Sequence, residues 1–151
     1  MFFLKELPGK AILEQYARKY PDMDVEKTDR ALHMMRSASL LIRDLEAYFA
    51  THDLSQTKFL TLIVLEREPD KLHLTLTEIC HRLDVSKTVI SKTLKTLEKQ
   101  GAIKIRQNIE DQRSKHIQIT AKGRKKIESL MPGYYQLINK HIEGNESYEQ
   151  K

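Results

Sequence analysis

The chain has 151 residues, 40% hydrophobic and 31% charged, which fits one domain with a sizeable core. No apolar run approaches the roughly 18 residues of a membrane span, and residues 1–7 lack the long apolar segment of a signal peptide. The single cysteine, Cys80, cannot form an internal disulfide, so we expect a reducing, cytoplasmic setting.

The positive charge is concentrated in one part of the chain. The net charge is +5, but residues 86–126 contain 12 Lys and Arg against 3 Asp and Glu, a balance of +9. The remainder contains 14 basic and 18 acidic residues, a balance of −4. Such clustering is expected where one face meets a polyanion, although a solvated basic surface would explain a charge run alone equally well.

The first third of the chain is predicted to be helical. A short helix over residues 11–20 ends at Pro21, and a longer helix covers about residues 26–50. Apolar residues recur along the longer helix at helical spacing, at Leu32, Met35, Leu41, Ile42, Leu45 and Phe49. Further apolar side chains broaden this stripe, so we expect one face inside the domain and one against a partner.

Capping residues predict the next elements. Ser55 is a good N-cap for a helix through about residue 67, and residues 71–74 could add a short strand. Thr75 and Glu78 have the spacing of a capping box, which opens a helix through about residue 83.

A tight turn and a second helix follow. Asp84 occupies the turn, where a short polar side chain tolerates left-handed geometry. Ser86 caps a helix through about residue 100, and Gly101 stops it. Alternation of apolar and polar residues then predicts half-buried strands over residues 103–106 and 116–119.

The last predicted helix covers residues 121–142. Thr120 provides its N-cap, and Pro132-Gly133 should kink or interrupt it. Residues 143–151 are polar and are expected to fray.

The helix after Ser86 has two different faces. Ile90, Leu94 and Leu97 share one stripe, which should face the core. The opposite side carries hydroxyls and ammonium groups from Ser86, Lys87, Thr88, Ser91, Lys92 and Lys95. A helix in a major groove needs such groups, for base edges and for phosphates. A lysine-rich surface helix is the alternative, but it would more often include acids at i,i+4 spacing.

The loop between the strands is also basic. Arg113 near its tip could enter a minor groove, where the negative potential is deepest when the groove is narrow. Asp111 would be repelled by phosphate, so we expect it to hold Arg113 or the loop backbone in position. The predicted DNA contacts here are Arg106, Gln112, Arg113, Ser114 and Lys115. An ordinary hairpin is the alternative.

Three motifs carry a family resemblance. Residues 83–101, LDVSKTVISKTLKTLEKQG, resemble the recognition segment of MarR-family regulators. Residues 111–114, DQRS, resemble the Asp-x-Arg-Ser wing signature of that family, and residues 119–123, ITAKG, resemble its Leu-Thr-x-x-Gly entry into the last helix. Their order and spacing match over roughly residues 53–137.

The resemblance implies a mainly α fold with a small β-hairpin wing, a winged helix-turn-helix with flanking dimerisation helices. We expect an N-terminal segment and long dimerisation helix in residues 1–50, and the DNA-binding lobe in residues 51–120. A C-terminal dimerisation helix and polar tail would fill residues 121–151. The dimer would rest on the predicted helices at residues 11–20, 26–50 and 121–142.

The resemblance also implies a function. It is that of a sequence-specific regulator of transcription, a repressor or, as the alternative, an activator, which binds double-stranded DNA as a homodimer on a pseudo-palindromic operator. A small-molecule effector would modulate binding from a pocket beside the lobe, with the candidates Met34, Met35, Tyr48, Tyr134 and Tyr135. Met and Tyr at helical spacing are more often core or dimer contacts. The expected location is the nucleoid in the cytoplasm of a bacterium or archaeon.

Other chemistry has little support in the sequence. No glycine-rich phosphate loop or nucleophile–base pair is visible, so we expect no enzyme activity and no cofactor. The six histidines and Cys80 lack zinc-binding spacing, and we expect no metal. Cys80 is interpreted as a packed thiol rather than a redox sensor. A winged-helix module that binds protein instead of DNA is the competing hypothesis.

Overall fold

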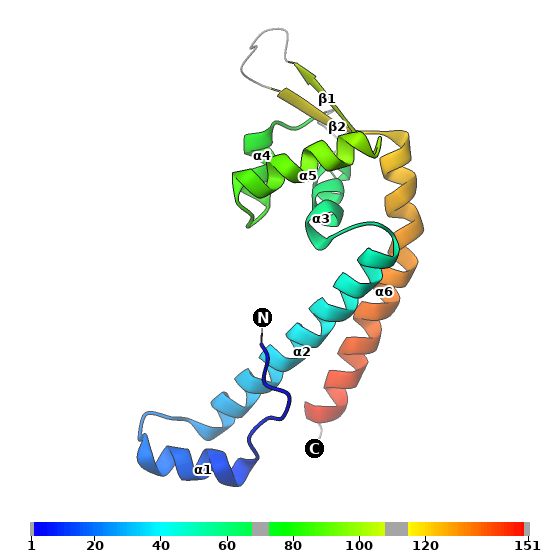
Figure 1. Cartoon of the computed structure of the whole chain (residues 1–151). Coiled ribbons are helices and arrows are strands. Elements are labelled where there is room, and N and C mark those ends of the chain that lie inside the picture. The colour runs from blue at the N-terminus through cyan, green and yellow to red at the C-terminus, as the bar shows by residue number, and fades with distance from the viewer. Residues whose placement is uncertain (1, 68–72, 108–114, 150–151) are drawn as a thin grey trace. The chain divides into compact units, whose positions relative to one another are not determined.

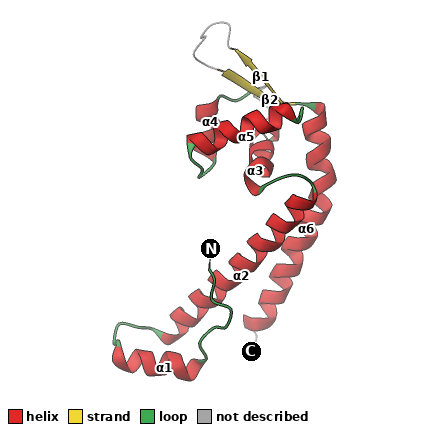
Figure 2. Ribbon diagram, in the orientation of Figure 1, coloured by secondary structure: helices red, strands yellow, loops and turns green. Residues whose placement is uncertain are grey.

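The computed structural model describes residues 2–67, 73–107 and 115–149, which form six helices and two strands (Figure 1). In chain order these are α1 (Lys10–Lys19), α2 (Val25–Thr51), α3 (Gln56–Glu66), α4 (Leu76–Arg82), α5 (Lys87–Lys99), β1 (Ile103–Gln107), β2 (Lys115–Ile119) and α6 (Ala121–Glu149). Helix dominates, as predicted for a mainly α chain with one small hairpin (Figure 2). No helix in the described part is long and apolar enough to cross a membrane.

The chain divides into two compact units, one made of Met1–Leu45 with Gln136–Lys151 and the other of Glu46–Tyr135. We call them the first unit and the lobe. Both α2 and α6 contribute to each of the two.

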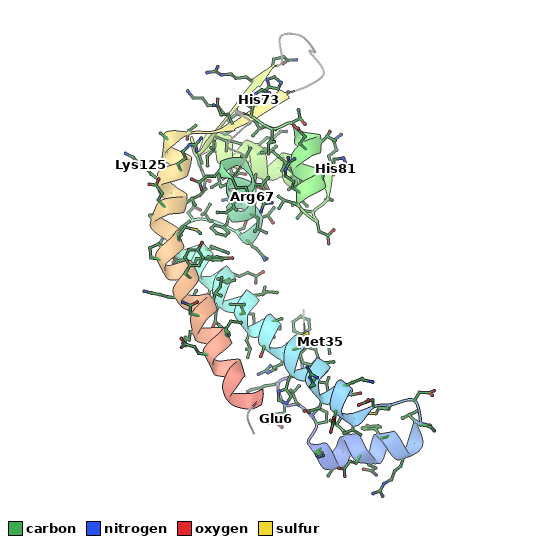
Figure 3. All side chains as sticks on the ribbon, turned by 180° about the vertical axis from the view of Figure 1, so that it is seen from behind. Glu6, Met35, Arg67, His73, His81 and Lys125 are labelled. Atoms are coloured by element: carbon green, nitrogen blue, oxygen red, sulfur yellow. The ribbon has the colours of Figure 1, made fainter. Side chains whose placement is uncertain are left out.

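In the first unit, the N-terminal segment is hydrogen-bonded to α2. The Phe2 carbonyl accepts hydrogen bonds from Ser39 Oγ and Arg43 Nη2, both at 2.9 Å. The Asp44 carboxylate of α2 lies 2.8 Å from the ring of His141 in α6. Met34 remains 70% exposed on α2 and Met35 remains 45% exposed, so the second apolar face of this helix is open in the single chain (Figure 3).

The lobe is held together by a continuous apolar core. β1 and β2 pair antiparallel, with Ile103 opposite Ile119 and Ile105 opposite Ile117. Leu74 adds a single bridge to the other side of β2, through backbone hydrogen bonds of 2.9 and 2.7 Å with Ile117. The largest fully buried side chains include Phe49, Leu62, Ile79, Ile90, Leu97 and Leu130. The hairpin is thereby anchored to the helices on one face.

The predicted helix caps are present. The Ser55 hydroxyl accepts the Lys58 amide, and Thr75 and Glu78 form both hydrogen bonds of the capping box. Thr120 Oγ1 accepts the Gly123 amide at 3.1 Å, at the start of α6. Because a cap depends on residues three apart in sequence, these elements begin where local chemistry places them.

Two turn predictions had different outcomes. Gly101 has φ of 72° and ends α5, as expected. The left-handed geometry predicted for Asp84 is wrong: among the described residues, the only positive-φ residue other than glycine is Asp53, with φ of 54°. Asp53 lies in the short turn that joins α2 to α3, whereas Leu83 leaves α4 through extended backbone.

The last helix is longer than predicted. The α6 backbone continues without interruption through Pro132-Gly133 and ends at Glu149, so the prediction of a frayed tail after residue 142 is wrong. A proline inside a helix removes one backbone donor, but the turns on either side are continuous here. The strand predicted over residues 71–74 is described only at His73 and Leu74, where it is a single bridge.

Candidate DNA-binding surface

The inner face of α5 is fixed on the core of the lobe. Ile90 and Leu97 have no exposed surface, and Leu94 is 4% exposed, as the apolar stripe predicted. The Ser86 hydroxyl accepts the Val89 amide and so caps the helix at its N-terminus. Because one face is locked against the core, the orientation of the opposite face is set as well.

The outer face of α5 is basic and rich in hydroxyls. Lys87, Thr88, Lys92 and Lys95 are exposed together with Ser86, and Ser91 is half-buried. The one acid of α5, Glu98, lies in its last turn. The face therefore offers cations for phosphates and short polar groups for base edges, without a carboxylate among them.

Val89 is a surface residue that the sequence patterns did not single out. It is 42% exposed, beside the capped N-terminus of α5. An exposed apolar group on a recognition helix can contact the methyl group of thymine. Its position in the first turn of the helix was the signal that could have identified it.

The hairpin strands carry further cations. Arg106 and Lys115 are exposed near the loop ends of β1 and β2. The predicted groove contacts Gln112, Arg113 and Ser114, and the predicted positioning residue Asp111, lie outside the described residues, so their roles remain predictions.

Two histidines meet on the outer face of this sheet, which the sequence did not reveal. The ring of His73, which is labelled in Figure 3, is stacked on that of His116, with centroids 3.5 Å apart. His116 is opposite Arg106 in the strand register. The contact between the two rings is a diagonal pairing across β2, which the bridge of Leu74 to Ile117 makes possible.

The five candidate pocket residues divide between the two units. Met34 and Met35 belong to the first unit, whereas Tyr48, Tyr134 and Tyr135 belong to the lobe. The Tyr48 hydroxyl donates to the Leu130 carbonyl at 2.9 Å.

Tyr134 packs in an aromatic cluster, with ring centroids 5.0 Å from Phe59 and 6.2 Å from Phe49. Tyr135 is 54% exposed. Two of the tyrosines therefore have packing roles in the lobe. Among the described residues, no group of three or more His, Cys, Asp or Glu side chains could hold a metal ion.

A capped helix-turn-helix with a basic outer helix face, followed by an antiparallel hairpin, defines a winged-helix DNA-binding protein. The sequence model of the MarR family matches residues 52–114. The HTH-type transcriptional repressor YetL of Bacillus subtilis (strain 168) is 30% identical over 148 residues, which are 98% of this chain and 87% of that protein. The chain therefore belongs to the MarR family and is a DNA-binding regulator of transcription.

Solved structures have the same fold. Sco3205, a MarR family transcriptional regulator from Streptomyces coelicolor solved in complex with DNA, is 18% identical with a TM-score of 0.72, over 85% of this chain and 84% of that one. BpsR of Bordetella bronchiseptica, whose DNA binding is regulated by 6-hydroxynicotinic acid, is 15% identical with a TM-score of 0.63, over 72% of this chain and 80% of that one.

Proposed function

We propose that this protein is a transcriptional repressor that binds a pseudo-palindromic DNA operator as a homodimer and is released or retained by a small-molecule effector. The observation that carries the proposal is the outer face of α5, which is basic, hydroxyl-rich and free of acids until its last turn. The relative YetL is a repressor, Sco3205 binds DNA, and the DNA binding of BpsR is regulated by 6-hydroxynicotinic acid.

The residues of α5 have two proposed roles. Ser86, Thr88 and Ser91 read base edges in the major groove, because their short side chains bring a donor and an acceptor close to the helix. The ammonium groups of Lys87, Lys92 and Lys95 bind flanking phosphates, which positions the helix without reading sequence.

The hairpin forms the second part of the proposed interface. Arg106 and Lys115 bind phosphates near the base of the loop, and Arg113 enters the minor groove with Gln112 and Ser114 beside it. Asp111 positions the loop and does not contact DNA.

Dimerisation is proposed through the helices that flank the helix-turn-helix and the hairpin, in residues 1–50 and 121–151. Large apolar side chains remain exposed in the first unit, including Ile12, Tyr16, Met34, Met35 and Ile142. Two copies would place their α5 helices in successive major grooves, with half-sites about 10 base pairs apart. The effector acts by binding one arrangement of the dimer better than another. The protein acts at the chromosome in the cytoplasm and catalyses no reaction.

The test is a binding titration with a duplex from the upstream region of the protein's own gene and a scrambled duplex. Wild type should prefer the upstream duplex, and Ser91→Ala should reduce that preference. Lys92→Ala should weaken binding to both duplexes, whereas Lys58→Ala is a matched control from α3, which lies outside the proposed DNA contacts and the proposed dimer interface. Equal affinity of wild type for both duplexes would refute sequence-specific repression. Unchanged binding by Arg113→Ala would favour a protein-binding module over a DNA reader.

A further inference from the structure

The C-terminal end of α5 is tied to the start of β1 by a rigid turn. The Gly101 amide donates to the Glu98 carbonyl and the Ala102 amide donates to the Leu97 carbonyl, both at 2.9 Å. This pair of hydrogen bonds is the Schellman motif, which needs the positive φ of Gly101. The turn brings the last turn of the recognition helix alongside the first wing strand.

The side chain of Glu98 also links the end of α5 to β1. Glu98 Oε1 accepts a hydrogen bond from the Ile105 backbone amide of β1 at 3.2 Å. In the sheet of the described residues, β1 pairs with β2 on one side only, so this amide lies on the open edge of the strand. Glu98 therefore satisfies an edge donor of the wing from the recognition helix.

Glu98 carries a negative charge among basic residues. It is the one acid on α5, and it lines a shallow hollow together with Lys104 and Arg106. A carboxylate is repelled by phosphates, so Glu98 is suited to a structural role within the protein rather than to DNA contact. The hydrogen bond to Ile105 provides that role.

We propose that Glu98 is a positioning residue that sets the angle between the recognition helix and the wing. This inference rests on the proposed function, in which α5 and the wing bind the same operator at once. Two elements that must reach separate grooves bind more tightly when their relative orientation is fixed before DNA arrives, because less freedom is lost on binding. Glu98 fixes that orientation with one hydrogen bond between the two elements.

A neighbouring hydrogen bond, made by Gln100, offers a matched control. Gln100 Nε2 donates to Asp53 Oδ2 at 2.6 Å and links the end of α5 to the turn between α2 and α3. Gln100 is close to Glu98 at the same helix end, but its side-chain partner is not in the wing. A variant of Gln100 therefore perturbs that helix end without releasing β1.

The experiment is a set of binding titrations on the operator duplex. The four single variants are Glu98→Ala, Glu98→Gln, Gln100→Ala and Arg113→Ala. The two double variants combine Arg113→Ala with Glu98→Ala and with Gln100→Ala. Glu98→Ala should weaken specific binding roughly three- to tenfold, the range expected for one hydrogen bond. Glu98→Gln should stay within about twofold of wild type, because its amide oxygen can still accept the Ile105 amide proton.

The double variants separate positioning from general stability. Once Arg113→Ala has removed the wing contact, Glu98→Ala should add little further loss, whereas Gln100→Ala should add its full effect. Hydrogen exchange in the free protein should accelerate at the Ile105 amide in Glu98→Ala and not in Gln100→Ala.

Three results would overturn the positioning role. They are unchanged or tighter binding by Glu98→Ala, full additivity of its effect with that of Arg113→Ala, and unchanged exchange at Ile105. The exchange measurement needs no DNA, so it tests the hydrogen bond even if a variant binds poorly. Failure of wild type to distinguish the operator from a scrambled duplex would instead overturn the proposed function and leave the exchange result intact.

Discussion

Replacing Gly123 with alanine tests the packing of α6 against the wing. In an ordinary helix, Gly→Ala is stabilising by about 0.5–1 kcal/mol, because glycine loses more backbone freedom on folding. At Gly123, however, an added Cβ would collide with the Ala102 carbonyl oxygen and lie 2.8 Å from Ile119 Cγ1. The obstacle is backbone, so it cannot rotate away.

The Ala102 carbonyl is also held in place by its own hydrogen bonds. It accepts the Thr120 amide at 3.0 Å and lies 3.0 Å from the Thr120 hydroxyl. Overpacking at such a site costs about 1–3 kcal/mol, which exceeds the gain in helix propensity. The expected net destabilisation is about 1–2 kcal/mol, and the midpoint of thermal unfolding should fall by about 2–8 °C.

Urea and thermal unfolding followed by circular dichroism measure this change. Gly133→Ala is the matched comparison, because the atoms in its way belong to the ring of Tyr48. Shortening that side chain with Tyr48→Leu should relieve Gly133→Ala, whereas Gly123→Ala cannot be relieved by removing one side chain. A Gly123→Ala protein as stable as wild type, or more stable, would refute the packing argument.

Three further predictions concern caps, charge and acid. Thr75→Ala should reduce the free energy of unfolding by about 0.5–2 kcal/mol, because it removes one half of the capping box with Glu78; no loss in a urea titration would contradict this. Lys92→Ala should lower the slope of log affinity against log salt by about 1, and an unchanged slope would mean that Lys92 does not contact phosphate. The hydrogen bond from the Lys27 backbone amide lowers the pKa of Asp24 below its ordinary value. The contribution of the Asp24 carboxylate to stability is therefore present above the unfolded pKa of about 3.9 and is lost as the pH falls through the lower folded pKa. Asp24→Asn should flatten the acid limb of the curve of stability against pH. An NMR titration of Asp24 with an ordinary midpoint would argue against this prediction.

Several features of the fold could be predicted because they depend on near neighbours. Ser55, Thr75 and Ser86 cap helices through hydrogen bonds to residues three positions away. The apolar stripe of α5 and the alternation in β1 and β2 follow from the two repeat lengths of helix and strand. The two faces of the recognition helix can therefore be predicted from the sequence alone.

Other features depend on residues that are distant in sequence. Asp53, in the turn between α2 and α3, takes the left-handed conformation that was predicted for Asp84. Because both residues are aspartates in short turns, local preference cannot distinguish the two positions. The stacking of His73 on His116 exists only because Leu74 bridges Ile117.

The sequence alone thus determined which helices and which hairpin form, about where they begin and which face of α5 is basic, because each depends on neighbours within about one turn of helix or on an alternating strand. Only the tertiary structure decided what those elements contact. Glu98 is the one acid of a basic helix, and its partner at Ile105 is apparent only when α5 and β1 are side by side. Gly123 matched the motif at residues 119–123, but the physical reason for a glycine there is the Ala102 carbonyl, with which a Cβ would collide. Contacts of this kind depend on how the elements pack, which neither periodicity nor capping specifies.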